Sequence, residues 1–183
     1  MAKRQWLLVI LLITVWFGAS RYNARVSQMS GSGFSAPNLT EPALPRKMAT
    51  GWTLLDSNGK LFDWSSTKDR LILVNIWATW CPPCRAELPS LANLANDKSL
   101  SDEVVVLCVS TDDRPEALKS YLQKNNLTFP AYFAPELPFD FVTEGIPATF
   151  LINSQGELLG SEVGAARWDA PEFIQQLKNR KSK

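Results

Sequence analysis

The chain has 183 residues, 45% of them hydrophobic, so it is long enough for one well-packed domain with an appendage and too short for two ordinary domains. Its 19 basic and 18 acidic residues leave a net charge of +1, and the only basic run occupies the last few positions, so we expect no nucleic-acid partner. The sequence contains no histidine, which excludes Ser-His and Cys-His catalysis and leaves cysteines and carboxylates to carry any chemistry.

The first 24 residues, MAKRQWLLVILLITVWFGASRYNA, have the pattern of an export or membrane signal. Lys3 and Arg4 precede an uncharged run from Trp6 to Ser20. As a helix, the segment from Trp6 to Ala19 is about 21 Å long, shorter than a hydrocarbon core of about 30 Å, and the run ends in small residues that suit cleavage, which favours a cleaved signal peptide. Aromatic residues near both ends and flanking arginines favour an uncleaved anchor.

We expect residues 1–24 to be an uncleaved single-pass anchor in the cytoplasmic membrane, because the basic residues before the span would hold the N-terminus in the cytoplasm. The catalytic domain would then lie in the periplasm, whereas cleavage would release a soluble periplasmic protein. Residues 25–50 mix Ser, Gly and Pro without periodicity, as is typical of a flexible tether. The folded domain is therefore expected to span residues 51–183.

The first half of this domain predicts a hairpin and then a strand-helix-strand unit. Two short apolar runs in residues 52–62 surround the turn sequence DSNG, which suits a hairpin. Residues 70–78, RLILVNIWA, and 104–110, VVVLCVS, are almost continuously apolar, as expected of parallel strands that are covered on both faces. The residues between them place leucines on one helical face, so we expect a right-handed βαβ unit whose helix is kinked at Pro89.

The second half predicts further helices and a second hairpin. Residues 112–126 suit a helix with Asp112 or Asp113 as its N-cap, followed by an extended stretch at 127–133. Two strands are expected around the turn at 155–156, and a last helix beginning at Asp169. The buried stripe of that helix would consist of Phe173, Ile174 and Leu177. This order predicts an α/β fold with a mixed central sheet flanked by helices and an N-terminal β-hairpin extension.

Cys81 and Cys84 stand two residues apart in TWCPPCRAE, between the predicted strand and helix. Such a pair can be half of a tetrahedral zinc site, a redox dithiol or a tight disulfide. Zinc needs four ligands and only Cys108 remains, so the chain cannot close a zinc site alone. A helix N-terminus favours thiolate over thiol, which makes Cys81 the expected attacking sulfur. Cys108 lies in an apolar strand and is expected to be a core residue, with a third redox partner as the alternative.

These residues resemble the thioredoxin superfamily, and in particular its TlpA/ResA-type membrane-anchored thiol-disulfide reductases. The resemblance runs from Trp52 to Lys178. The motif LVNIWATWCPPCRAELPSL is similar to the family's active-site strand, dithiol and helix, and EGIPATFLIN is similar to its cis-proline loop and following strand. The resemblance therefore implies a thioredoxin-like sandwich.

The resemblance also implies a role for each matching residue. Cys81 would be the nucleophile and Cys84 the resolving thiol of a redox-active disulfide. Trp80, Ile146 and Pro147 would bind the substrate, with Trp80 as an apolar wall, or else as simple packing. Pro147 would be cis and face the cysteines, which would leave the Ile146 backbone free to pair with an extended substrate strand.

Two polar positions concern the proton of the resolving cysteine. Ordinary thioredoxins carry a buried acid at the position of Asn75, and an asparagine cannot accept a proton as a base. Glu87 matches a carboxylate that TlpA/ResA-type proteins keep at this point, three residues after Cys84. It would accept the proton as a catalytic residue if burial raises its pKa. The alternative is a solvated surface acid that pairs with Arg85.

The expected function is an extracytoplasmic reductase of partner-protein disulfides that an upstream membrane thiol reductant restores. The resemblance implies substrates such as the haem-binding cysteines of apocytochrome c or copper-site thiols. We expect a monomer without cofactor or metal. Three alternatives stay open: a thiol oxidase or isomerase that uses the same pair, a Cu(I)-binding carrier, and a docking module whose dithiol is incidental.

Overall fold

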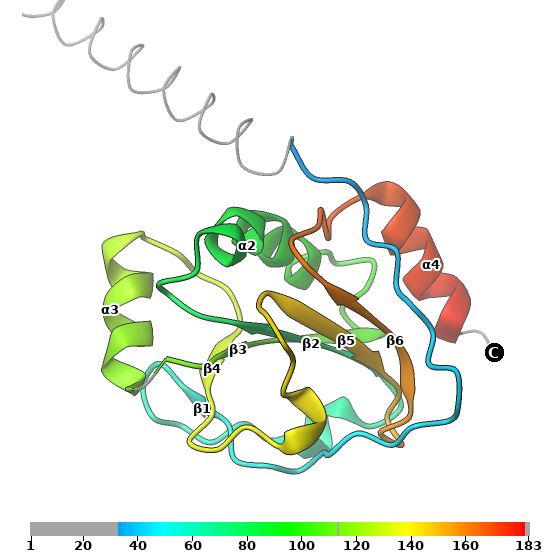
Figure 1. Ribbon diagram of the computed structural model, residues 1–183, viewed down its shortest axis with the longest axis horizontal. Helices are drawn as coiled ribbons and strands as arrows, with labels where there is room; N and C mark the ends of the chain where they lie inside the picture. Colours follow the sequence, from blue (N-terminus) through cyan, green and yellow to red (C-terminus); the bar gives the residue numbers. More distant parts are fainter. Residues whose placement is uncertain (1–32, 113, 182–183) are drawn as a thin grey trace, which may run out of the picture.

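A mixed β-sheet forms the centre of the computed structural model, which describes residues 33–112 and 114–181 (Figure 1). Its six strands lie in the order β1-β4-β3-β2-β5-β6. β2, β3 and β4 are parallel, whereas β1, β5 and β6 are antiparallel to their neighbours, which confirms the predicted mixed sheet. The strands span Leu55–Asp56 (β1), Leu71–Trp77 (β2), Val104–Ser110 (β3), Ala131–Phe133 (β4), Ala148–Ile152 (β5) and Leu158–Val163 (β6).

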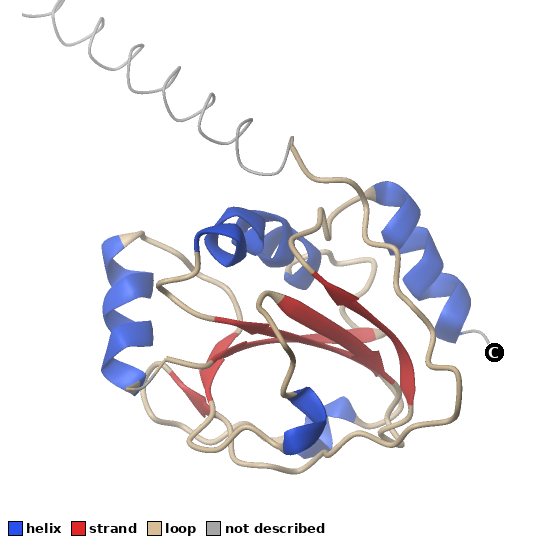
Figure 2. Ribbon diagram, in the orientation of Figure 1, coloured by secondary structure: helices blue, strands red, loops and turns tan. Residues whose placement is uncertain are grey.

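Three helices cover one face of the sheet (Figure 2): α2 (Pro82–Ala95), α3 (Pro115–Lys124) and α4 (Pro171–Lys181). Side chains from β2 and from all three helices share one apolar core beneath them. A second core lies on the opposite face, where two short 3-10 helices pack, η1 (Trp64–Thr67) and η2 (Phe139–Phe141). All seven residues of β2 are buried because alternate side chains enter the two cores.

The predicted supersecondary units are present. β2 and β3 pair in parallel from Leu71 opposite Val104, with α2 as the crossover, and β5 and β6 form the predicted antiparallel hairpin. The turn of that hairpin needs glycine. Gly156 has a φ of 79°, and an added Cβ would lie 2.9 Å from the carbonyl oxygen of Met48. The hairpin at residues 52–62 also forms, and its β1 strand joins the sheet edge beside β4.

The predicted cap of α3 is wrong. The helix begins at Pro115, its N-cap residue is Arg114, and no side chain of the described residues caps it. The carboxylate of Asp112 instead accepts hydrogen bonds from Thr79, which follows β2. The other predicted cap, Asp113, lies outside the described residues.

The predicted start of α4 at Asp169 is also too early. The helix begins at Pro171, and the first N–H groups within it donate to the carbonyl oxygen of Ala170. Asp169 instead accepts hydrogen bonds from the side chains of Asn93 and Arg167. The predicted buried stripe is present, with Phe173 and Leu177 fully buried and Ile174 partly buried.

Residues 33–50, predicted to belong to a flexible tether, pack along β6 in the structure. Thr40 and Ser161 exchange backbone hydrogen bonds of 2.8 and 2.9 Å, and the N–H of Met48 donates to Gly156. The buried Met48 side chain adds to the second core. The predicted anchor at residues 1–24 lies outside the described residues. In the described ranges, no helix is long and apolar enough to cross a membrane.

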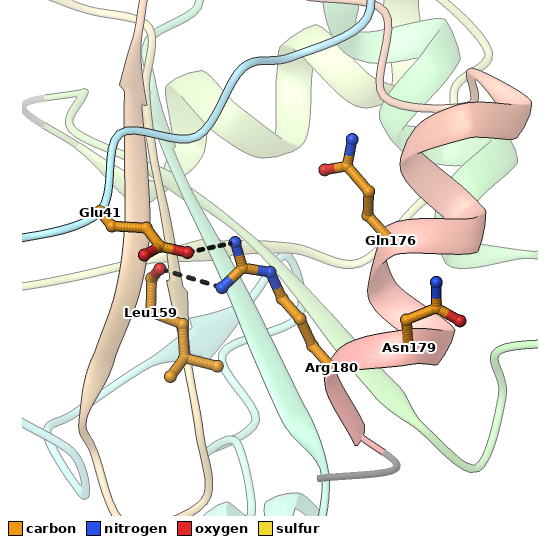
Figure 3. Close-up of a pocket in the computed structure, with 5 residues that line it drawn as sticks. All are labelled: Glu41, Leu159, Gln176, Asn179 and Arg180. Carbon is orange, nitrogen blue, oxygen red and sulfur yellow. Dashed lines mark hydrogen bonds and ion pairs between the residues drawn. The ribbon is translucent and has the colours of Figure 1, made fainter.

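Arg180 of the last helix forms hydrogen bonds with this N-terminal segment and with β6 (Figure 3). Arg180 of α4 donates to the Glu41 carboxylate at 3.0 Å and to the carbonyl oxygen of Leu159 at 3.2 Å. The pocket that these residues line, with a volume of about 440 Å³, contains none of the residues that the sequence marks for chemistry. Its lining residues are instead the place where the N-terminal segment, β6 and α4 contact one another.

Candidate active site

Cys81 and Cys84 lie where β2 passes into α2, as the sequence predicts. Cys81 is the N-cap residue of α2, and its sulfur is bonded to that of Cys84 in a disulfide. Both residues are buried, with 3% of Cys81 and none of Cys84 exposed. The structure thus brings the two sulfurs together just below the protein surface, and Cys81 is the more exposed residue of the pair.

The start of α2 favours a negative charge on Cys81. The backbone N–H of Cys84 donates to the Cys81 sulfur over 3.3 Å. Pro82 and Pro83 have no N–H, so this is the first donor that the helix offers. Together with the positive end of the helix dipole, it stabilises a thiolate over a thiol once the disulfide is reduced.

The loop before β5 faces the disulfide. The peptide bond between Ile146 and Pro147 is cis, which confirms the sequence prediction for this bond. The carbonyl oxygen of Ile146 lies 3.7 Å from the Cys81 sulfur, and the Pro147 carbonyl accepts a hydrogen bond from Gly164 at 2.9 Å. This loop therefore forms the wall of the site opposite the helix.

Trp80, immediately before Cys81, is exposed over 67% of its surface. Trp80 is therefore not a core residue, and simple packing in the interior does not account for it. An exposed indole next to a nearly covered disulfide offers apolar area to whatever approaches the sulfurs.

Glu87 is fully buried on the inner face of α2, so the alternative of a solvated surface acid is wrong. Its Oε2 accepts hydrogen bonds from the indole N–H of Trp168 at 2.8 Å and the backbone N–H of Ala166 at 3.1 Å. Its Oε1 accepts from the side chain of Asn75 at 2.8 Å. Burial raises the pKa of Glu87 to about 7, although these three hydrogen bonds pull it down.

Asn75 holds Glu87 in place. Its Nδ2 donates to Glu87 and also to the hydroxyl of Thr149 at 2.9 Å. Its Oδ1 is buried and has no hydrogen-bond partner in the part of the chain that the structure describes. An amide carries both a donor and an acceptor, so rotation of this side chain lets it serve the ionised or the protonated carboxyl.

Cys108 is fully buried in the core beneath α2, as predicted. Burial raises the pKa of its thiol, and the nearby charge of Glu87 adds to the increase. A thiol in this state is a poor nucleophile. Among the described residues, no group of three or more Cys, Asp or Glu side chains is placed to hold a metal ion.

Two hydrogen-bond partners of Glu87 come from a distant part of the chain, and the sequence did not reveal them. Ala166 and Trp168 lie about 80 residues away, in the connection between β6 and α4. Ser90 of α2 fixes that connection, because its hydroxyl accepts the backbone N–H of Trp168 at 3.1 Å. The only local signal was a tryptophan among small and polar residues just before a helix, which does not identify a partner.

A second group whose role the sequence did not reveal is the Asp112 carboxylate, which supports the loop that carries Trp80 and Cys81. The Asp112 carboxylate, almost fully buried, accepts from the backbone N–H and the hydroxyl of Thr79, the latter at 2.6 Å. The hydroxyl of Ser110 also donates to it. Asp112 therefore fixes the chain two residues before the nucleophilic position.

Replacing Asp112 is expected to loosen this loop. Asp112→Ala leaves three donors without their acceptor, so we expect a loss of about 2 to 3 kcal/mol in the free energy of unfolding and slower thiol exchange at Cys81. Urea unfolding and exchange kinetics measure both effects. Asp56→Ala is the control, because the Asp56 carboxylate also accepts local hydrogen bonds, from two backbone N–H groups, but in an exposed turn. Equal stability losses and unchanged exchange in both variants would contradict the role of Asp112.

Comparisons with known proteins agree with this geometry. The family model described as Redoxin matches residues 31–177. The thiol-disulfide oxidoreductase ResA of Bacillus subtilis is 26% identical over 155 residues, which cover 82% of this chain and 79% of ResA. The thiol:disulfide interchange protein DsbE of Yersinia pestis is 38% identical over 125 residues, covering 66% and 64% of the two chains.

A solved structure supports the fold. The crystal structure of StoA from Bacillus subtilis matches with a TM-score of 0.55 and 24% identity, covering 76% of this chain and 99% of that one. The sheet order, the helix that starts at a cysteine pair and the match over residues 31–177 lead to one conclusion. The chain is a protein thiol-disulfide oxidoreductase and belongs to the Redoxin family.

Proposed function

We propose that this oxidoreductase reduces disulfides of partner proteins outside the cytoplasm, with Cys81 and Cys84 as its reactive dithiol. The observation that carries the proposal is the setting of the Cys81 sulfur. It sits at the N-terminus of α2, 3.7 Å from the Ile146 carbonyl oxygen and next to the exposed Trp80. Trp80, Ile146 and Pro147 would bind the partner, with the Ile146 backbone pairing with an extended segment.

In the reduced protein, the Cys81 thiolate attacks one sulfur of the partner's disulfide. A mixed disulfide forms, and the partner's other sulfur leaves as a thiolate that takes a proton from solvent. The Cys84 sulfur then attacks Cys81, which releases the partner's second thiolate and forms the Cys81–Cys84 disulfide. Two electrons pass from the dithiol to the partner, and this disulfide is the state that the structure shows.

Glu87 would accept the proton of the Cys84 thiol before this second attack. Both residues are buried, and they lie three positions apart on the inner face of α2. Burial raises the pKa of Glu87 to about 7, which is closer to the pKa of a thiol than the pKa of an ordinary carboxyl group is. Transfer of the proton from Cys84 to Glu87 therefore costs less free energy.

The apolar segment near the N-terminus supports the location in this proposal. Residues 1–24 would anchor the protein in the cytoplasmic membrane, with the domain on the periplasmic side. An upstream membrane thiol reductant would restore the dithiol of the monomer, because that compartment is oxidising. The partners would be haem-binding cysteines of apocytochrome c or copper-site thiols.

Trapping the mixed disulfide tests this function. In Cys84→Ser the first attack proceeds but the resolving thiol is absent, so partners should accumulate covalently on Cys81. Non-reducing electrophoresis and mass spectrometry of cells that express the variant would identify them. The control is the double variant Cys81→Ser/Cys84→Ser, which should trap nothing. Equal trapping by the double variant, or none by Cys84→Ser, would overturn the proposal.

A further inference from the structure

Among the described residues, Trp168 is the one side chain from outside the sheet and α2 that donates to Glu87. Its indole N–H lies 2.8 Å from Oε2, and the whole residue is buried. The ring packs edge-on against Phe173 of α4 with 5.4 Å between centroids. The backbone N–H of Trp168 donates to Ser90 of α2. The indole is therefore fixed on two sides while its N–H points at the carboxylate.

We propose that Trp168 is a positioning residue for disulfide exchange, whose indole N–H holds the Glu87 carboxylate and sets the pH at which Glu87 accepts the proton of Cys84. This inference rests on the proposed role of Glu87 as proton acceptor. It adds to that role the residue that decides how far the carboxylate is ionised.

The chemistry of the indole makes its effect one-sided. An indole N–H is a donor only, so it binds the negatively charged oxygen of the ionised carboxylate more strongly than an oxygen of the neutral acid, and it cannot accept the proton of the acid. The amide of Asn75 can donate or accept, and can therefore serve either form of Glu87. The N–H of Ala166 also donates only, but it belongs to the backbone. Asn75 also lowers the pKa of Glu87 by donating, but Trp168 is the side chain that can act in this direction only.

The other titratable and charged groups around Glu87 do not provide this bias. Cys84 on α2 does not titrate in the disulfide form, and burial raises the pKa of Cys108 on β3. The facing residues of β2 and β5, Asn75 and Thr149, carry no charge. Arg167, on the same connection as Trp168, is exposed and pairs with Asp169 at 3.1 Å. Among the described residues, no cation contacts the Glu87 carboxylate.

The connection that carries Trp168 also reaches the opposite wall of the site. Gly164 donates to the carbonyl oxygen of Pro147, and two residues later Ala166 donates to Glu87. The chain from Gly164 to Trp168 therefore links the cis-proline loop to the buried carboxyl. A change at Trp168 acts on the carboxyl first, because the hydrogen bond of Gly164 does not involve the indole.

The chain contains a matched control for Trp168. Trp77 at the end of β2 is also fully buried in the core beneath the helices, but its indole N–H has no hydrogen-bond partner within residues 33–112 and 114–181. Replacement by phenylalanine removes a similar volume and one indole N–H at either position. Only at Trp168 does it remove a hydrogen bond to Glu87.

The decisive experiment titrates the Glu87 carboxyl by carbon NMR in the full-length disulfide form, where neither Cys81 nor Cys84 titrates. Trp168→Phe is expected to raise the titration midpoint by about one pH unit, a tenfold change in the ratio of ionised to protonated carboxyl at a given pH. Trp77→Phe should leave the midpoint unchanged. An unchanged or lowered midpoint in Trp168→Phe, or an equal increase in both variants, would overturn the inference.

The reaction provides a second readout. An aromatic disulfide that releases one coloured thiolate at each step separates attack by Cys81 from resolution by Cys84. The pH midpoint of the resolution rate should rise by about one unit in Trp168→Phe, and not in the Glu87→Gln background, because Trp168 acts through Glu87. A similar shift in that background would overturn the inference. A wild type that releases neither thiolate would instead refute the proposed function, while the NMR titration would still decide whether Trp168 controls Glu87.

A third measurement needs no variant of Trp168 and stays available if that variant does not fold. The indole N–H resonance of Trp168 in the wild type should move with pH at the midpoint of the Glu87 titration. It should lose this dependence in Glu87→Gln, and the resonance of Trp77 should not follow it. An indole resonance of Trp168 that ignores the titration would contradict the hydrogen bond on which the inference rests.

Discussion

Cys81→Ser is expected to lower the rate of disulfide reduction to the uncatalysed background while leaving the fold intact. A serine hydroxyl does not ionise near neutral pH and cannot form a disulfide, so both the attack and the electron transfer are lost. The side chains are nearly the same size, and the position is the N-cap of α2, where serine is a favourable residue. Reduction of a model protein disulfide and thermal unfolding measure the two effects.

The control for this variant is Cys108→Ala, which removes the cysteine that lies outside the reactive pair. Cys108 lies in the core beneath α2, and burial raises the pKa of its thiol, so full activity is expected with some loss of stability. Activity of Cys81→Ser above background, together with inactivity of Cys108→Ala, would make Cys108 the nucleophile and contradict the assignment.

The stability of the protein is expected to fall as pH rises from about 4.5 to about 7, and Glu87 is the cause. The pKa of Glu87 is about 7 in the folded protein, whereas in the unfolded chain it has the ordinary glutamate value of 4.5. Between these values the folded protein holds a proton that the unfolded chain releases, so each step up in pH favours unfolding. Over this window the loss from Glu87 is on the order of 3 kcal/mol, and above it the curve flattens.

Glu87→Gln is expected to remove this decline, which urea unfolding over a series of pH values would measure. The Gln side chain keeps an oxygen for Trp168 and Ala166, and rotation of the Asn75 amide can present its unpartnered Oδ1 to the new N–H group. The same variant should slow resolution by Cys84. Glu116→Gln, an exposed acid in the first turn of α3, is the control and should keep the decline. An undiminished decline in Glu87→Gln would show that another group causes it.

Much of the site could be predicted because its signals are local. The continuous apolar run at 70–78 indicates a strand covered on both faces, and it becomes the central β2. The cysteine pair followed by a leucine pattern places Cys81 at a helix N-terminus. The cis form of the Ile146–Pro147 bond is different, because general chemistry makes it improbable for any one bond and only the family resemblance predicts it.

What could not be predicted depends on contacts between distant residues. Asp112 and Asp169 stand where local rules place helix caps, but Thr79 and Asn93 donate to them instead. The segment at 33–50 has the composition of a tether, yet β6 is an edge strand with free backbone groups that it can pair with. The proton affinity of Glu87 likewise depends on Trp168, far along the chain.

The reduction potential of the Cys81–Cys84 pair tests the central claim most directly. Equilibration of the full-length protein with glutathione buffers, followed by mass spectrometry of the alkylated thiols, measures it. A reductase is expected near or below about −270 mV, the potential of thioredoxin. A potential near about −120 mV, typical of proteins that form disulfides, would contradict the claim and make the protein a thiol oxidase.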